Sequence, residues 1–116
     1  MLLVDDDDGV REFLATVLTR KGHAVDAVPT CLDALFHFIR IPYDCLILDL
    51  CLPEGNGLHV YHQARRIDPY LAERVVFITG YDESHPLYQQ ARELSLPVLS
   101  KPLSIPRLIE ILNGYS

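Results

Sequence analysis

Five short segments with strand character alternate along this chain with longer amphipathic segments, and this alternation limits the fold more than any other feature. The short segments lie at residues 2–4, 23–28, 45–48, 75–78 and 97–99. Strands that are joined through helices must lie parallel, and right-handed crossovers place helices on both faces of the sheet. The pattern therefore predicts an α/β fold with a doubly wound, five-stranded parallel sheet and five helices.

Apolar residues at helical spacing mark the five intervening helices. The first helix is expected to bury Val10, Phe13, Leu14, Val17 and Leu18. The second is expected to bury Leu32, Leu35, Phe36 and Ile39. The expected N-caps, in chain order, are Asp8, Thr30, Asn56, Ser84 and Ser104.

Composition limits the class of protein. The chain has 116 residues, of which 49% are hydrophobic, so residues 1–116 are expected to form one domain with a substantial core. The net charge of −6 disfavours direct binding of nucleic acid, which requires clustered basic residues. No apolar run approaches the ~20 residues that span a bilayer. Three widely spaced cysteines fit reduced thiols, so a cytoplasmic location is expected.

Polar side chains follow four of the five predicted strands. Asp5 and Asp6 end the first strand, Asp49 the third, Thr79 the fourth, and Lys101 comes directly after the fifth. Carboxyl ends of parallel strands share one edge of the sheet, so these groups are expected to converge. Clustered carboxylates repel one another, and Mg²⁺ with a nearby lysine would offset that repulsion. The set suits phosphoryl transfer, with an aspartate as the nucleophile.

These residues lie in four short motifs whose order and spacing resemble a known family. The motifs are Leu3-Val4-Asp5-Asp6-Asp7, Leu48-Asp49-Leu50-Cys51-Leu52-Pro53 with Gly57, Phe77-Ile78-Thr79-Gly80, and Leu99-Ser100-Lys101-Pro102. Together they resemble the receiver domain of two-component response regulators over nearly the whole chain. The resemblance implies a flavodoxin-like sheet with strand order 2-1-3-4-5.

The resemblance also implies a role for each site residue. Asp49 would be the phosphoacceptor, and Thr79 and Lys101 would bind the phosphoryl group. The Mg²⁺ ligands would be Asp6 directly, Asp5 mainly through a coordinated water, Asp49, and the backbone carbonyl of Cys51. The Lys101-Pro102 peptide bond would be cis.

The implied partners follow from the same family. A histidine kinase or a phosphotransfer protein would donate the phosphoryl group. An output partner or domain would bind the face made by the fourth helix, the fifth strand and the fifth helix. Such a domain catalyses its own modification without turning over a small molecule, so it is not expected to be an enzyme. The oligomeric state stays open, with a homodimer as one option.

The sequence departs from the family pattern at two places, Val98 and the segment 94–97, and Cys51 and Tyr81 occupy two variable positions of the family. Val98 occupies the position of the usual switch aromatic, and Tyr81 is a candidate substitute. Tyr81 and Cys51 flank the phosphoryl position, where a bulky Tyr81 is expected to lengthen the life of the acyl phosphate. The segment 94–97 lacks the common Gly-Ala pair, which favours a receiver from a hybrid or multidomain kinase over a free-standing regulator.

Two other functions remain open at this stage. A docking-only pseudo-receiver would use the same fold without phosphorylation, and the altered switch position at Val98 is compatible with it. An Mg²⁺-dependent aspartyl phosphatase would also use an aspartate nucleophile. Phosphatases of the haloacid dehalogenase type carry Asp-x-Asp after the first strand, whereas Asp5 and Asp6 are adjacent here.

His59 and His62 share a helix face but have no apparent third metal ligand.

Overall fold

Five parallel strands form the central sheet of the computed structural model, which describes residues 1–115. The strands are β1 (Leu2–Val4), β2 (Asp26–Val28), β3 (Leu46–Asp49), β6 (Val75–Thr79) and β7 (Val98–Ser100). Their spatial order is β2-β1-β3-β6-β7, and every pairing is parallel. The predicted fold class and strand order are therefore confirmed.

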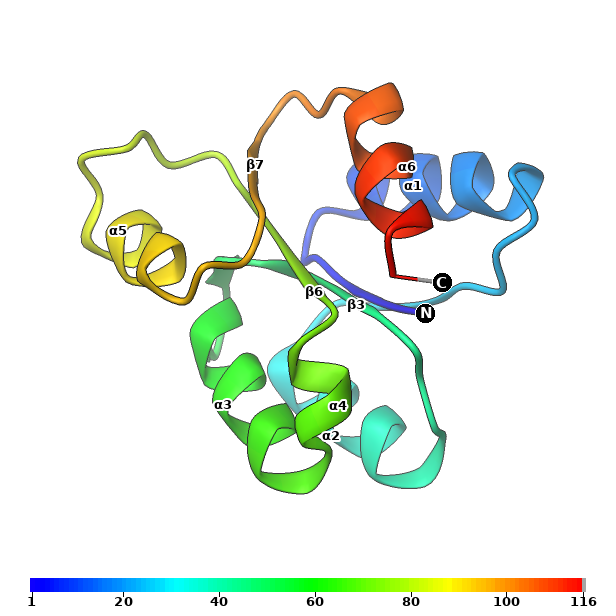
Figure 1. The fold of residues 1–116 in the computed structure, drawn as a ribbon, viewed down its shortest axis with the longest axis horizontal. Helices are drawn as coiled ribbons and strands as arrows, with labels where there is room; N and C mark the ends of the chain where they lie inside the picture. Colours follow the sequence, from blue (N-terminus) through cyan, green and yellow to red (C-terminus); the bar gives the residue numbers. More distant parts are fainter. Residues whose placement is uncertain (116) are drawn as a thin grey trace.

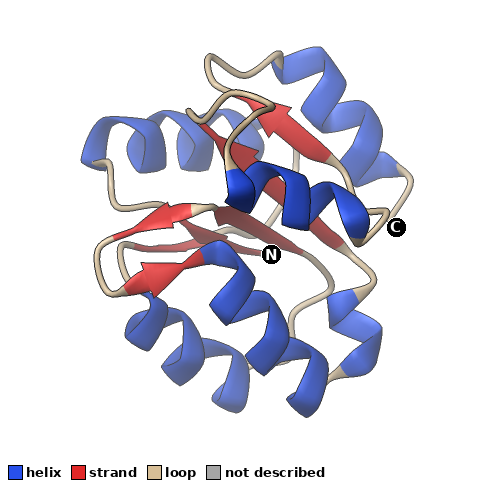
Figure 2. Ribbon diagram, turned by 90° about the vertical axis from the view of Figure 1, so that its left-hand side faces the viewer, coloured by secondary structure: helices blue, strands red, loops and turns tan. Residues whose placement is uncertain are grey.

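Within residues 1–115, six helices cover the sheet on both faces (Figures 1 and 2). They are α1 (Asp8–Arg20), α2 (Cys31–Arg40), α3 (Gly57–Ile67), α4 (Pro69–Ala72), α5 (Pro86–Glu93) and α6 (Ile105–Asn113). Helices α1 and α6 pack on one face, where Leu14 and Leu108 meet Ile47. Helices α2, α3, α4 and α5 pack on the other, where Phe38 and Leu48 are buried. Alternate residues of each central strand thus enter separate cores.

One helix and one strand pair were not predicted. Pro69 was expected only to end the third helix, but it also begins the one-turn helix α4, which Asp68 caps by accepting a hydrogen bond from the Leu71 N–H (3.2 Å). Proline suits the first position of a helix because its missing N–H has no partner there. Strands β4 (Cys51–Leu52) and β5 (Gly55–Asn56) form a small antiparallel pair after β3.

Three of the five predicted N-caps are confirmed, namely Thr30, Asn56 and Ser104. The other two were each placed one residue away from the true cap. Asp7 caps α1 because its carboxylate accepts from the Val10 N–H (3.0 Å). His85 caps α5 in place of Ser84, whose own backbone N–H donates to Asp82.

Three of the four residues predicted to form the buried face of α2 are exposed, whereas the fourth, Leu35, is partly buried against the core. Leu32, Phe36 and Ile39 are 55%, 49% and 58% exposed, whereas Cys31, Ala34 and Phe38 enter the core. The helix is apolar on two sides, so helical spacing alone was satisfied by either face. Phe13 on α1 was also expected to be buried but is 56% exposed.

Candidate functional site

Neighbouring strands bring two aspartates together at the carboxyl edge of the sheet. β1 pairs with β3 in the register Val4–Leu48, so Asp5 and Asp49 follow at matching positions. Both carboxylates are buried, while Asp6 is exposed. Carboxylate oxygens of Asp5, Asp6 and Asp49 lie within 4.8 Å of one another, which is the predicted convergence.

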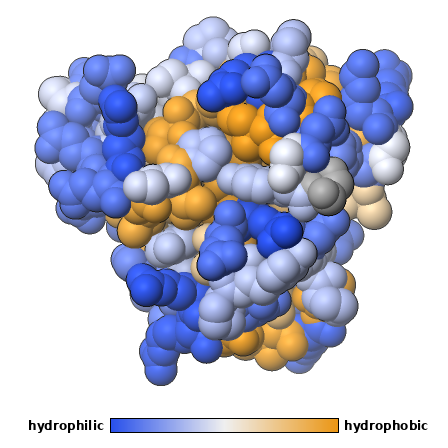
Figure 3. Space-filling view, in the orientation of Figure 1, coloured by the Kyte–Doolittle hydropathy of each residue, from blue (hydrophilic) through white to orange (hydrophobic). Residues whose placement is uncertain are grey.

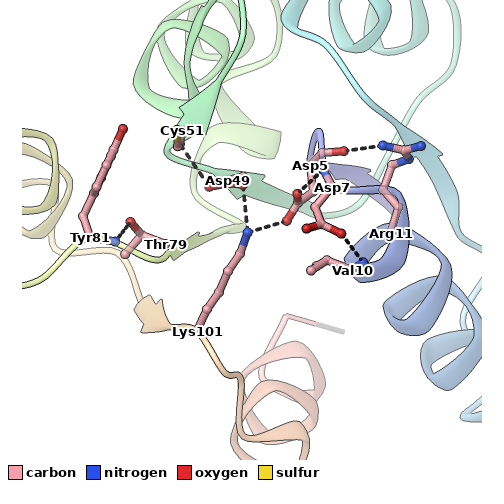
Figure 4. A network of polar contacts seen from close by, with 9 residues as sticks. All are labelled: Asp5, Asp7, Val10, Arg11, Asp49, Cys51, Thr79, Tyr81 and Lys101. Atoms are coloured by element: carbon pink, nitrogen blue, oxygen red, sulfur yellow. Dashed lines mark hydrogen bonds and ion pairs between the residues drawn. The ribbon is translucent and has the colours of Figure 1, made fainter.

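Lys101 lies between the two buried carboxylates (Figure 4). Its Nζ donates to Oδ2 of Asp49 at 2.9 Å and lies 2.9 Å from Oδ2 of Asp5. The backbone N–H of Lys101 donates to the Thr79 carbonyl (2.8 Å), which fixes the start of the side chain at the edge of β6. The predicted cis bond between Lys101 and Pro102 is present.

The surroundings of Asp49 shift its acidity. Burial raises the pKa of Asp49 to about 6, and the charge of Asp5 adds to the rise. The Cys51 N–H, which donates to Oδ1 of Asp49 at 3.0 Å, and Lys101 act in the opposite direction. For Lys101 itself, burial lowers the pKa, but the two carboxylates outweigh it and the net shift is upward. The pocket therefore holds more negative charge than its one lysine neutralises.

The acidic cluster fits a hard divalent cation. Oδ1 of Asp5 accepts from the Asp7 N–H (2.9 Å), and the buried Oδ2 has only the ion pair with Lys101, whose ammonium it shares with Asp49. One ammonium shared by two buried carboxylates, with Asp6 beside them, leaves excess negative charge that a divalent cation would offset. Mg²⁺ prefers such oxygen ligands and retains several waters, for which exposed Asp6 leaves room.

Thr79 and Tyr81 form the opposite wall of the site. Thr79 is buried at the end of β6, and its Oγ1 accepts from the Tyr81 N–H (2.9 Å). The Cys51 side chain raises the pKa of the Tyr81 phenol, and both residues lie at the mouth of the site. They line a hollow of about 350 Å³ with Asp6, Asp7, Asp49, Gly80 and Lys101.

Two contacts at the site were not predicted from the sequence. Arg11 donates from Nη1 to the backbone carbonyl of Asp5 (2.9 Å) and also pairs with Asp8. The ring of Tyr81 stacks on His85, with centroids 3.7 Å apart and planes 4° from parallel. A basic residue one turn into the first helix was the only available signal for Arg11, and no motif marked His85.

The backbone also comes very close to the site at Gly57. A Cβ at this position would lie 2.5 Å from the carbonyl oxygen of Asp49. The Gly57 N–H donates to the Leu50 carbonyl (3.2 Å), which ties the start of α3 to the end of β3. Only glycine allows this approach without moving the backbone that carries Asp49.

Curated relatives match this chain over most of its length. It is 29% identical to the response regulator receiver protein CpdR of Brucella abortus, over 94% of this chain and 89% of that protein. It is 28% identical to sporulation initiation phosphotransferase F of Bacillus subtilis, over 99% and 91%. A response regulator receiver protein of Anaeromyxobacter is 34% identical, and this chain spans 45% of its length.

Solved structures agree with the fold. The response regulator TrrA of Thermotoga maritima, in complex with Mg²⁺ and BeF, superposes with a TM-score of 0.83, at 26% identity, covering 99% of this chain and 96% of that one. A CheY-like receiver domain protein of Methanospirillum hungatei gives a TM-score of 0.87 at 21% identity, covering 97% and 89%.

None of the helices within residues 1–115 is long and apolar enough to cross a membrane.

The profile of the response regulator receiver domain matches residues 1–113. This match agrees with the sheet order, the carboxylate cluster and the cis bond described above. The chain therefore belongs to the receiver domain family of two-component response regulators.

Proposed function

We propose that this chain receives a phosphoryl group on Asp49 in a two-component phosphorelay. The observation that carries the proposal is the position of the Asp49 carboxylate, which is buried beside Asp5 and bound by Lys101 at 2.9 Å. A carboxylate in this setting is a nucleophile held beside a cationic group that is able to stabilise the transferred phosphoryl oxygens. Asp49, Thr79 and Lys101 are the proposed reacting and phosphoryl-binding residues.

The donor is proposed to be a phosphohistidine of another protein, a histidine kinase or a phosphotransfer protein. None of this chain's five histidines lines the hollow at Asp49. A carboxylate oxygen of Asp49 would attack phosphorus, the phosphorus–nitrogen bond would break, and the imidazole would leave. Thr79 Oγ1 accepts from Tyr81, so its own O–H is free to donate to a phosphoryl oxygen.

Asp6, Asp49 and the backbone carbonyl of Cys51 are the proposed direct Mg²⁺ ligands, with Asp5 acting mainly through a water. Bound there, Mg²⁺ supplies positive charge that offsets the cluster and the incoming phosphate. The clustering of the Asp5, Asp6 and Asp49 carboxylates around one shared lysine supports this assignment.

The output surface is proposed to be the face of α5, β7 and α6. Val98 on β7 packs against the core and has no polar tip to report the state of the site. Tyr81 offers another route because its ring stacks on His85, the N-cap of α5. A change at Tyr81 on phosphorylation would thus reach α5 through His85.

Intact-mass measurement after treatment with acetyl phosphate and Mg²⁺ tests the phosphoacceptor. The wild type should gain one phosphate, and Asp49→Asn should gain none. Asp44→Asn is the matched control, because the Asp44 side chain is 78% exposed. An Asp49→Asn variant that is still phosphorylated would contradict the assignment, and an unmodified wild type would indicate a docking-only pseudo-receiver.

Calorimetric titration with Mg²⁺ tests the metal ligands. Asp6→Ala should weaken binding by more than about tenfold, since loss of even an indirect partner of a metal commonly costs that much. Asp8→Ala, which removes an exposed carboxylate paired with Arg11, is the control. Equal Mg²⁺ affinities for the two variants would show that Asp6 is not a ligand of the metal.

An aryl phosphate assay separates the receiver from an aspartyl phosphatase. We expect no steady multiple turnover, because the domain is proposed to modify itself and not to act as an enzyme on small molecules. Sustained release of the aryl alcohol would favour the phosphatase.

We further propose that residues 1–116 act as one receiver domain in the cytoplasm.

A further inference from the structure

Helix α2 carries an exposed apolar stripe on the side away from its core face. The stripe consists of Leu32, Phe36 and Ile39, each about half exposed. Their spacing of four and three residues places them on one side of the helix. Figure 3 shows apolar side chains reaching the surface at the lower end of the molecule, where Figure 1 places α2 together with α3 and α4.

The stripe continues into a groove between α2 and α3. The groove has a volume of about 330 Å³ and is lined by Leu32 and Leu35 of α2 and by His59, Val60 and Gln63 of α3, among others. The lining residues of α2 belong mainly to its N-terminal half, whereas Ile39 stands near its C-terminal end. If α2 of a second copy packs antiparallel to this α2, the C-terminal end of the second helix lies over the groove. Its Ile39 would then stand above the groove.

Charged residues at the edge of the stripe are arranged for self-association. Asp33 lies near the N-terminal end of α2 and Arg40 at its C-terminal end, and seven residues, two helical turns, separate them on the same side. Within residues 1–115 neither side chain forms an ion pair, and the Arg40 guanidinium lies 4.8 Å from the centre of the Phe36 ring. A two-fold axis beside Phe36 would place Arg40 of each copy opposite Asp33 of the other.

Charged residues around α3 follow the same order as on α2, with an acidic residue just before the N-terminal end and a basic residue towards the C-terminal end. Glu54 lines the N-terminal end of the groove, and Arg66 lies seven residues after His59, on the same side of α3. The same two-fold axis therefore brings Glu54 of one copy towards Arg66 of the other. Antiparallel helices also oppose their dipoles, which favours this pairing over a parallel one.

We propose that α2 and the adjoining edge of α3 bind a second copy of this chain in an antiparallel, two-fold symmetric dimer. Phe36 meets its equivalent near the axis, and Ile39 of each copy enters the groove beside Leu32 of the other. The paired α2 and α3 helices form a four-helix arrangement that closes with two copies. This dimer does not depend on the phosphorylation of Asp49, so it is tested without a phosphodonor.

Sedimentation velocity from about 1 to about 500 μM, a range that brackets a modest dimer, measures the association. The wild type should shift from monomer to dimer as concentration rises. Phe36→Glu should raise the dimer Kd by at least about 30-fold, as expected for a residue at the centre of an interface. Phe13→Glu is the control, because Phe13 is similarly exposed but lies on α1, on the other face of the sheet.

A charge exchange tests the direction of the pairing. Arg40→Asp and Asp33→Arg should each weaken the dimer by about tenfold, because each places like charges opposite one another. The double variant restores opposite charges and should return the Kd to within about threefold of the wild type. Circular dichroism of each variant confirms that the helix still forms.

Three outcomes would overturn the proposal. A wild type that stays monomeric over the whole range would show that a different partner, or none, covers the stripe. A dimer that resists Phe36→Glu would use another face. A double variant no better than the single variants would exclude the antiparallel arrangement.

Discussion

At the residue scale, Ser95 holds a backbone conformation that suits glycine better. Its φ of 59° makes it the one non-glycine residue with positive φ in the described chain, at the turn between α5 and β7. Left-handed backbone costs an L-residue more than it costs glycine, although glycine loses more entropy on folding. Ser95→Gly should therefore stabilise the fold by roughly 0.5–1 kcal/mol in urea unfolding. Ser95→Ala keeps the penalty and should show no gain.

Tyr81 is expected to slow the loss of phosphate from Asp49. Tyr81 and Cys51 both line the hollow at Asp49, which attacking water must enter. Tyr81→Ala should shorten the half-life of the phosphorylated protein, measured by intact mass after removal of the donor. Tyr81→Phe keeps the ring and should retain most of the shielding. Equal rates for Tyr81→Ala and the wild type would contradict this role.

The convergence of the site residues could be predicted because it depends on topology alone. Asp5 and Lys101 follow their strands and Asp49 ends its own, and the carboxyl ends of these strands share one edge, so knowledge of the sheet was sufficient to place the three together. The contacts of Arg11 and His85 could not be predicted, because they depend on loop and rotamer geometry that no periodicity encodes.

At the scale of single elements, α2 shows what helical spacing cannot decide. The spacing predicted the helix and its cap, Thr30, correctly. It did not select the buried face, because Phe36 and Phe38 are both aromatic and lie on different sides of one short helix. Packing against β1 and α3 settles the choice, and that information lies outside the segment.

A pair of alanine substitutions tests this orientation of α2. Phe38→Ala should lower the free energy of unfolding by about 3–5 kcal/mol, because Phe38 is buried in the core. Phe36→Ala should cost less than about 1 kcal/mol when measured at low protein concentration, where self-association does not contribute. Urea unfolding of both variants provides the comparison, and a reversed order would show that the helix is rotated.

At the scale of the whole molecule, buried acidic groups limit stability in alkaline solution. Burial raises the pKa of the Cys45 thiol to about 12 from an ordinary value of 9.0, and burial also raises the pKa values of Tyr43 and Tyr115. Between pH 9 and about pH 12 the Cys45 thiol of the unfolded chain loses its proton, while that of the folded chain keeps it. The stabilisation is therefore complete below pH 9 and is lost as pH rises towards 12.

Cys45→Ala should reduce this dependence. The free energy of unfolding should fall less steeply by up to about 1.4 kcal/mol per pH unit in the alkaline range. The slope of the free energy of unfolding against pH is compared, and not its absolute value, because the substitution also removes buried volume and so lowers stability at every pH. Cys51→Ala, which changes an exposed thiol, should leave the slope as in the wild type. Identical slopes for Cys45→Ala and the wild type would assign the alkaline loss to Cys31, whose pKa burial also raises, and to the tyrosines.

The carboxylate of Asp49 and the ammonium of Lys101 meet although 52 positions separate them in the chain. A denatured polypeptide has no such pocket, so whatever binds there binds only the native form and shifts the equilibrium towards it. Proteases in turn attack mainly opened molecules. An occupied pocket would consequently extend the lifetime of the polypeptide in a cell, and resistance to digestion would serve as a simple readout of its occupancy.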